Sequence, residues 1–378
     1  DDTTACDDIV FEHENNIPTI EVGDLAATLA RAALMEFVNG NANNVDINIS
    51  ASEQQEWLLR FKASITLGPS NSLSNWNSHT PLCNWTGITC TTTPISQSVV
   101  ALDLYSMGLE GTISPVLGNL SSLRSLDLSN NTLHGQIPHQ LAQLSRLHIF
   151  SLYGNDLEGT IPAPLSSCRN LYDLWLSYNR LHGSIPSELS LLSTLKTLYL
   201  RANNLTGVIP PSLGNLSRLT IIEFGENNLQ GPIPPSLGNL SALIKVEFDE
   251  NNLQGPIPSE MGTIPPSLTN LSQLKILNLY ENQLSGHIPW EIGTKLTRLQ
   301  ILNLWENELS GNIPSSIGNC SNLAILYLNN NQLSGMVPIE LGKSSLLKWL
   351  NLWGNQLVSG SSSTLTLLTA LTNCSRLE

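Results

Sequence analysis

One phrase returns along most of this chain at intervals of about 24 residues. Residues 126–138 read LDLSNNTLHGQIP, residues 151–162 read SLYGNDLEGTIP and residues 175–186 read WLSYNRLHGSIP. A period of roughly 20 to 29 residues is typical of a solenoid, in which a repeat buries its apolar face only by stacking on its neighbours. The length of 378 residues alone would favour two or three globular domains, and the period overrides that expectation.

Ten repeats share the template L-x-x-L-x-L-x-x-N-x-L-x-G-x-I-P-x-x-L-G-x-L-x-x, after a less regular repeat that begins at Val99. Because L-x-L alternates with period two, we expect one short strand per repeat, buried on one face and stacked in parallel at roughly 4.8 Å. Gly permits a tight bend and Pro cannot donate to a ladder, so G-x-I-P predicts a short extended segment on the flank instead of a long helix. The ten repeats begin at Leu123, Leu147, Leu171, Leu195, Leu219, Leu243, Leu274, Leu299, Leu323 and Leu347.

An asparagine stands at a fixed position after each of these strand segments. A buried Asn side chain has donors and an acceptor that need partners. We expect the backbone of the adjacent coil to supply them, so that losing one such Asn costs about 1–3 kcal/mol. The column consists of Asn131, Asn155, Asn179, Asn203, Asn227, Asn251, Asn282, Asn307, Asn331 and Asn355.

The segment before the repeats is predicted to be helical. It reads SEQQEWLLRFKASI over residues 52–65. Ser52 and Gln55 fit a capping box, and three apolar residues fall on one helical face. These three are Leu58, Phe61 and Ile65. A stretch with two cysteines, CNWTGITC, follows at residues 83–90.

This combination of helix, cysteine pair and L-x-G-x-I-P repeats resembles the plant-specific class of leucine-rich repeat proteins over residues 52–378. The resemblance implies an α/β leucine-rich repeat solenoid, a curved and twisted superhelix with a concave parallel β-sheet and a second short sheet on the flank. It also implies that residues 52–98 form an amino-terminal cap with a disulfide between Cys83 and Cys90. Such a cap covers the leucines of the first coil, which would otherwise meet solvent.

We expect three segments along the chain. Residues 1–51 are an extension of unknown role with short strands and one helix, which is predicted from Asp24 to Val38. Residues 52–98 are the cap, and residues 99–378 are about eleven repeats.

Two repeats are irregular. The repeat from Leu243 carries seven extra residues around TIPPSLTNLSQ, which we expect to form a surface bulge. After Leu357 the last repeat departs from the template. No carboxy-terminal cap is recognisable there, so we expect the repeats to be truncated or uncapped. A bare solenoid end would expose apolar surface, so we expect either that more protein follows or that something covers that end.

The charge is unevenly distributed. The net charge is −14, and residues 1–56 hold twelve acidic residues against the single base Arg31. The rest of the chain holds nineteen acidic and sixteen basic residues, so neither part favours nucleic acid or an anionic membrane as partner. No apolar run reaches the roughly 18 residues of a membrane span. The opening DDTTACDD is not a secretory signal.

Cys168, Cys320 and Cys374 stand where the template has leucine, and we expect them to be small buried hydrophobes. Cys6 has no assigned partner. Sequons and the disulfide implied by the resemblance favour the secretory pathway, and hence an extracellular or cell-surface location. The predicted glycosylation sites are Asn48, Asn84, Asn119, Asn130, Asn204, Asn215, Asn239 and Asn270.

The side chains between the strand leucines are not needed in the core, and we expect them to be exposed on the concave face. Aromatic and acidic residues gather there, which suits an extended, partly basic peptide or a sugar chain. This assignment requires Trp175, Trp305 and Trp353 to line that face instead of packing inside. The predicted ligand-binding residues are Tyr153, Trp175, Tyr178, Tyr199, Arg201, Glu223, Glu247, Asp249, Tyr280, Trp305, Tyr327 and Trp353.

The sequence holds no catalytic constellation, no metal-ligand spacing and no cofactor motif, so we predict neither an enzyme nor a cofactor or metal site. The resemblance is to the extracellular part of leucine-rich repeat receptor-like kinases and receptor-like proteins. In that family the solenoid binds a peptide or another ligand and recruits a co-receptor. We therefore expect a ligand-recognition ectodomain with a protein or peptide ligand.

Two alternatives stay open. One is a structural protein in which residues 1–50 dock on a second copy and produce head-to-tail oligomers or filaments. The other is a secreted inhibitor of a cell-wall-degrading enzyme, as in the polygalacturonase inhibitors, which share this repeat.

Overall fold

The computed structural model describes residues 49–67, 72–91, 97–257, 271–358 and 363–377. The chain divides into two units, Asp1–Asn44 and Val45–Glu378, and the described residues all belong to the second. The helix predicted from Asp24 to Val38, Cys6 and most of the extra residues in the repeat from Leu243 lie outside the described residues.

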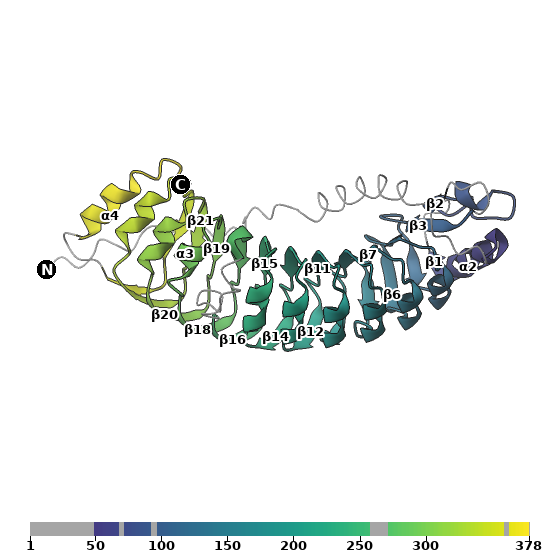
Figure 1. Cartoon of the computed structure of the whole chain (residues 1–378), viewed down its shortest axis with the longest axis horizontal. Coiled ribbons are helices and arrows are strands. Elements are labelled where there is room, and N and C mark those ends of the chain that lie inside the picture. The colour runs from purple at the N-terminus through teal and green to yellow at the C-terminus, as the bar shows by residue number, and fades with distance from the viewer. Residues whose placement is uncertain (1–48, 68–71, 92–96, 258–270, 359–362, 378) are drawn as a thin grey trace. The chain divides into compact units, whose positions relative to one another are not determined.

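In the described part of the chain, twelve short strands form one long sheet whose neighbours follow one another in chain order (Figure 1). They are β2 (Ile88–Cys90), β3 (Val99–Asp103), β5 (Ser125–Asp127), β7 (Ile149–Ser151), β9 (Asp173–Trp175), β11 (Thr197–Tyr199), β13 (Ile221–Glu223), β15 (Lys245–Glu247), β17 (Ile276–Asn278), β19 (Ile301–Asn303), β21 (Ile325–Tyr327) and β23 (Trp349–Asn351). β2 and β3 are antiparallel, whereas β3 and β5 and the pairs that follow are parallel. Leu198 lies opposite Leu174 and Ile222, which is the register of one strand per coil.

The G-x-I-P half of the coils forms further short strands on the flank, as predicted. One sheet contains β1 (Ile65–Leu67), β4 (Glu110–Thr112), β6 (Thr132–Gln136) and β8 (Asp156–Glu158). The other contains β10 (His182–Ser184), β12 (Asn204–Gly207), β14 (Asn228–Gly231), β16 (Asn252–Pro256), β18 (Gln283–His287), β20 (Glu308–Asn312), β22 (Gln332–Gly335) and β24 (Gln356–Leu357). The template glycine makes the bend: Gly183 has a φ of +76°, which a Cβ disfavours.

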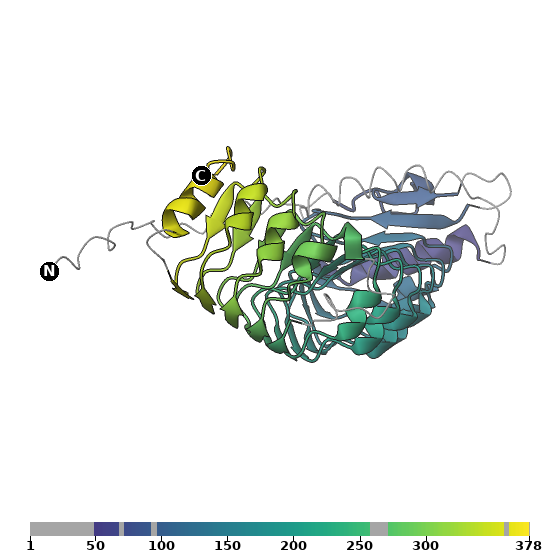
Figure 2. The same cartoon turned by 60° about the vertical axis from the view of Figure 1, so that its left-hand side comes forward.

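Most coils return to the long sheet through one helical turn, and Figure 2 shows these turns side by side. They are η2 (Pro115–Asn119), η3 (His139–Gln143), η4 (Ala163–Ser167), η5 (Ser187–Leu191), η6 (Pro211–Asn215), η7 (Pro235–Asn239), η9 (Leu271–Gln273), α3 (Ile292–Lys295), η10 (Ser315–Asn319) and η11 (Ile339–Lys343). The segment that departs from the template after Leu357 contains helix α4 (Ser363–Leu371), which packs against η11. The predicted α/β solenoid is confirmed.

The template leucines fill one continuous interior. Every leucine that opens one of the ten template repeats is at most 1% exposed. Cys168, Cys320 and Cys374 are buried among these leucines, as expected of small hydrophobes. Burial raises the pKa of the Cys168 and Cys320 thiols to about 11, so both stay protonated at physiological pH.

The helix before the repeats is α2 (Ala51–Ala63), and its capping box involves other residues than predicted. The Ser50 hydroxyl accepts the Glu53 N–H at 3.2 Å, and Glu53 Oε2 accepts the Ser50 N–H at 2.9 Å. The prediction of Ser52 and Gln55 is therefore wrong. The helix begins one residue earlier than predicted, which brings a second Ser-x-x-Glu pattern to its start.

α2 packs its apolar side on aromatic residues of the cap. Leu58 and Phe61 are 0% exposed, and Phe61 lies 6.3 Å from the ring of Trp76. Trp76 stacks on Trp85 at 5.3 Å between ring centroids. Ile65, which the prediction placed on the same helical face, instead begins strand β1.

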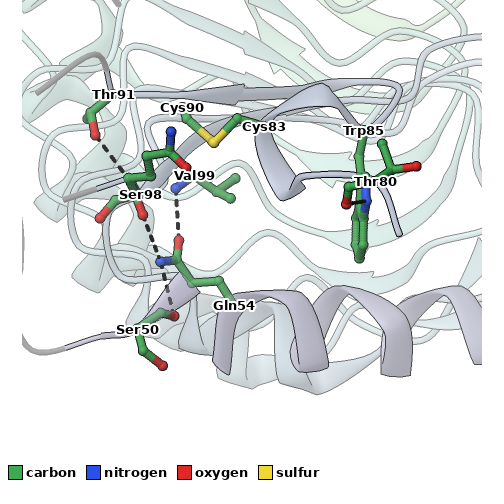
Figure 3. The surroundings of a disulfide bond; sticks show 10 residues. Ser50, Gln54, Thr80, Cys83, Trp85, Cys90, Thr91, Ser98 and Val99 are labelled. Carbon is green, nitrogen blue, oxygen red and sulfur yellow. Dashed lines mark hydrogen bonds between the residues drawn. A yellow bond between two sulfur atoms is a disulfide. The ribbon is translucent and has the colours of Figure 1, made fainter. Parts of the chain in front are cut away.

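The disulfide between Cys83 and Cys90 is present, with Cα atoms 5.6 Å apart (Figure 3). It links η1 (Leu82–Asn84) to β2, the first strand of the long sheet. Gln54 of α2 joins the cap to the first coil, because its Oε1 accepts the Val99 N–H at 2.8 Å. The disulfide that the resemblance implied is confirmed.

The asparagine column forms a ladder between coils. Asn227 is typical: its Oδ1 accepts the Leu205 N–H of the preceding coil at 3.0 Å. Its Nδ2 donates at 3.0 Å to the carbonyls of Leu200, Phe224 and Gly225. The adjacent backbone thus satisfies each buried Asn, as predicted.

Candidate functional site

The three-residue strands of the long sheet place their middle residue in the interior. Their first and third residues, and the residue two positions further on, project from the opposite side, which we call the sheet face. In β11, Leu198 points inward while Thr197, Tyr199 and Arg201 belong to the sheet face. By this register Trp175, Trp305 and Trp353 project from the sheet face, and so do the other predicted binding residues except Tyr178. Tyr178 lies one position further along its coil, at the edge of that face, with a φ of 56°.

Aromatic side chains of adjacent coils pack against one another on this face. Tyr153 lies 5.1 Å from Tyr178, Trp175 meets Tyr199 edge-on at 5.7 Å, and Tyr280 stacks on Trp305 at 5.4 Å. Three of these rings are shielded, contrary to the expectation that they would be exposed: Trp175, Tyr199 and Tyr280 are at most 9% exposed. By contrast, Trp353 is 74% and Tyr178 is 44% exposed, and Trp305 and Tyr327 are half-buried.

Two residues that sequence reasoning missed hold Trp175 in place. Its Nε1 donates to Thr197 Oγ1 at 2.9 Å, and Thr197 Oγ1 donates to Asp173 Oδ1 at 2.6 Å. Burial raises the pKa of Asp173. Both residues precede the first interior leucine of a strand, so period-two alternation, applied one residue earlier, would have found them.

Arg201 forms an ion pair with each of two carboxylates. Its Nε and Nη2 donate to Glu226 Oε1 at 3.0 and 2.7 Å, and its Nη1 lies 2.7 Å from Asp249 Oδ2. Arg201 is expected from sequence to be free for a ligand, but its side chain is only 14% exposed and its charge is already neutralised. Asp249 is 0% exposed.

A glycine makes room for this arrangement. Gly225 lies in the coil between those of Arg201 and Asp249 and in the same column. A Cβ at Gly225 would lie 2.8 Å from Asp249 Oδ2 and would also collide with Arg201 Nη1. Arg201 therefore reaches across an entire coil only because residue 225 has no side chain.

Lys245 is a third residue that sequence reasoning missed. Its Nζ lies 2.8 Å from Glu223 Oε1 and 3.1 Å from Glu247 Oε2. All three side chains are between 11% and 16% exposed. Burial raises the pKa of both carboxylates, although the charge of Lys245 opposes this.

The edge of the sheet face next to this cluster is acidic. Glu226, Glu250, Glu281 and Glu306 occupy the same position in four consecutive coils, with φ between 50° and 53°. The Tyr280 hydroxyl donates to Glu250 at 2.8 Å. Within the described residues, neither Glu281 nor Glu306 forms an ion pair.

The middle of the sheet face therefore carries excess negative charge beside an aromatic pair. Seven carboxylates face two cations, Arg201 and Lys245, which leaves a surplus of five negative charges. Burial, together with Glu250 and Glu306, raises the pKa of Glu281. The seven are Glu223, Glu226, Glu247, Asp249, Glu250, Glu281 and Glu306.

The described ranges lack two further features. No helix there has both the length and the apolar character that a membrane crossing requires. No group of three or more His, Cys, Asp or Glu side chains in those ranges is arranged to hold a metal ion.

Family models match most of the described solenoid. The leucine rich repeat N-terminal domain matches residues 51–91. Leucine rich repeat models match residues 122–144, 170–192, 194–216, 218–240, 273–294 and 297–357.

Curated relatives include proteins of Arabidopsis thaliana. Protein MALE DISCOVERER 2 is 40% identical over 81 residues, which is 21% of this chain and 11% of that protein. The LRR receptor-like serine/threonine-protein kinase EFR is 41% identical over 68 residues, 18% of this chain and 6% of that protein. The chain thus spans about a tenth or less of these relatives' lengths.

Solved structures match more of the chain. The ectodomain of the receptor kinase GASSHO1/SCHENGEN3 from Arabidopsis thaliana, in complex with CASPARIAN STRIP INTEGRITY FACTOR 2, aligns with a TM-score of 0.71 and 34% identity. That alignment covers 86% of this chain and 43% of that one. The Arabidopsis receptor kinase HAESA, in complex with the peptide hormone IDA and the co-receptor SERK1, aligns with a TM-score of 0.66 and 33% identity. That alignment covers 81% of this chain and 54% of that one. A plant ice-binding protein aligns with a TM-score of 0.67 and 26% identity, over 82% of this chain and 96% of that one.

Proposed function

This chain belongs to the plant-type leucine-rich repeat family, and we propose that it is a non-catalytic, receptor-type ectodomain that binds an extended, basic peptide on its sheet face. The observation that carries the proposal is the surplus of five negative charges beside the stacked pair of Tyr280 and Trp305. Arginine and lysine side chains complement carboxylates and also stack on aromatic rings.

The charges differ in what they can do for a ligand. Arg201 and Lys245 neutralise carboxylates within the chain and hold them in place. Glu281 and Glu306 lie next to Tyr280 and Trp305 and are not used in this way, so they are the carboxylates that a basic side chain would reach. An extended peptide that crosses successive coils would meet the two about 4.8 Å apart, one per strand.

The test measures binding of an alternating Arg-Ala hexapeptide to the full chain by isothermal titration calorimetry. The double variant Glu281→Gln/Glu306→Gln should weaken binding about tenfold or more, since each exposed charge contributes about 1 kcal/mol at contact distance. Raising the salt concentration should weaken binding to the unmodified chain as well.

Glu308→Gln is the matched control. Glu308 is an exposed carboxylate of β20, so the variant removes a charge from the same coil but from the flanking sheet. Its affinity should equal that of the unmodified chain. Equal affinities for the control and the double variant would show that the acidic edge does not bind the peptide.

The proposed location is extracellular or at the cell surface, with a co-receptor as a second protein partner. The homologous receptors are plant ectodomains, and the HAESA complex contains both a peptide hormone and a co-receptor. Five predicted glycosylation sites are exposed and stay proposals: Asn84, Asn119, Asn204, Asn215 and Asn239.

Asn130 is a poorer glycan acceptor than these five. Its side chain is half-buried, and its Nδ2, the atom that would carry the glycan, donates to the Tyr105 hydroxyl at 2.9 Å. Asn48 and Asn270 lie outside the described residues. Peptide mapping of the secreted protein before and after enzymatic deglycosylation would show sugar at the five exposed sites and none at Asn130.

A further inference from the structure

Asp249 has an unusual position among the carboxylates of the sheet face. Its side chain is 0% exposed, and its cationic partner among the described residues is Arg201, whose Nη1 lies 2.7 Å from Oδ2. This contact is an ion pair without a well-aligned hydrogen bond. Arg201 donates two aligned hydrogen bonds to Glu226 instead. Arg201 would therefore stay bound on the sheet face if Asp249 lost its charge.

The surroundings of Asp249 make its ionised form costly. The Asn278 amide donates to Oδ1 at 3.3 Å, which is a weak bond. Burial raises the pKa of Asp249 to about 6 against the opposing charge of Arg201, and Glu247 adds to the rise. Among the described residues, the titratable and charged groups that face this cluster are Tyr178, Tyr199, Arg201, Glu223, Glu226, Lys245, Glu247, Glu250, Tyr280 and Glu281. None of them is a histidine, so a carboxylate must account for any titration of the cluster near neutral pH.

We propose that Asp249 is a pH-sensitive element of the sheet face, ionised and sharing Arg201 with Glu226 at neutral pH, and protonated at mildly acidic pH, where Arg201 pairs with Glu226 alone. The surplus of negative charge beside Tyr280 and Trp305 then falls from five to four. Affinity for a basic peptide falls with it. This last consequence rests on the proposed function, whereas the protonation step does not.

The protonation step is tested without a ligand. The full chain is labelled with ¹⁵N-arginine, and the Nε–H resonance of Arg201 is followed from pH 4.5 to 8. The resonance should shift with a midpoint near pH 6 in the unmodified chain and should not shift in Asp249→Asn. Because the unmodified chain carries the measurement, the test does not depend on the variant folding well.

Asp156→Asn is the matched control. Asp156 pairs with Arg180 at 2.7 Å, but these side chains are 42% and 68% exposed, so the same substitution is made in a solvated pair. The control should keep the titration of Arg201 unchanged. An Arg201 resonance that stays constant over the whole pH range, or that titrates equally in Asp249→Asn, would overturn the proposal.

The regulatory consequence is tested with the alternating Arg-Ala hexapeptide at pH 7.5 and 5.0. Affinity of the unmodified chain should fall about fivefold at pH 5.0, as expected for the loss of one charge in contact range. Asp249→Asn should lose most of that difference. If Arg201 titrates and the peptide binds equally at both pH values, the regulation is refuted. If Arg201 titrates and the peptide binds at neither, the pH-sensitive element stands and the proposed function fails.

Discussion

The hydrogen-bond partners of one asparagine in the ladder determine how much stability its loss should cost. Asn227→Ala removes one acceptor and the donor to three carbonyls. Each carbonyl keeps another donor: Asn203 Nδ2 bonds Leu200, Asn251 Nδ2 bonds Phe224, and the Ala202 N–H bonds Gly225. The donor side has no such reserve, because the Leu205 N–H loses its Asn227 acceptor in a buried environment.

The cost should therefore be that of one orphaned N–H group, about 1–3 kcal/mol, and not that of four hydrogen bonds. Urea unfolding of the full chain measures it as a lower midpoint, with the slope compared because repeat arrays depart from two-state behaviour. Amide exchange should accelerate at Leu205 more than at its neighbours.

Asn228→Ala is the control for this prediction, because Asn228 is the next residue along the chain and its side chain is exposed in β14. It should change stability by less than about 0.5 kcal/mol. A loss of about 5 kcal/mol in Asn227→Ala would refute the idea of a reserve on the carbonyl side. A loss no larger than that of Asn228→Ala would refute the assignment of a structural role to the ladder.

Three further changes test other features. Gly225→Ala should lower the unfolding free energy by about 1–3 kcal/mol in urea, because the new Cβ collides with Arg201 and Asp249, and unchanged stability would contradict that geometry. The folded-state pKa of Asp249, about 6, exceeds its ordinary 3.8, so the folded chain holds this proton more tightly. The stabilisation that this proton gives the folded chain is thus fully present below about pH 4 and is lost, by about 3 kcal/mol, as pH rises through about 6. Urea midpoints of the unmodified chain should therefore fall across this pH range, and those of Asp249→Asn should fall less. Replacing Cys83 and Cys90 by Ala should cost about 2–3 kcal/mol in the same assay, and no loss would show that the cap holds without its crosslink.

The solenoid could be predicted because its physical causes are local and repeat. Neighbours one coil away determine three features of each repeat. These are the buried leucines of the strand, the bend at the template glycine and the buried Asn after the strand. Errors arose where two local signals compete. At the start of α2, Ser50 and Ser52 both precede a Glu or Gln by three residues, and only the helix boundary decides which of them caps.

The sequence predicted which residues project from the sheet face, but not how exposed their side chains are. Which residues project from it follows from period two, whereas their exposure depends on contacts between coils. Trp175 is shielded by Tyr199, and Arg201 reaches Asp249 across Gly225; both contacts depend on side-chain lengths and directions that a template position does not specify. Lys245 was missed because the strand was taken to begin one residue later than it does.

The asparagine ladder also has a polarity. Each coil takes its acceptor from the coil that follows it, as Leu133 does from Asn155 and Leu157 from Asn179. A break between two coils thus leaves the unmet donor on the amino-terminal side of the break. Removing or adding whole repeats leaves every donor N–H with an acceptor, whereas a cut within a repeat leaves one donor without an acceptor. Changes in the length of this array, natural or engineered, are therefore expected to occur in steps of whole repeats.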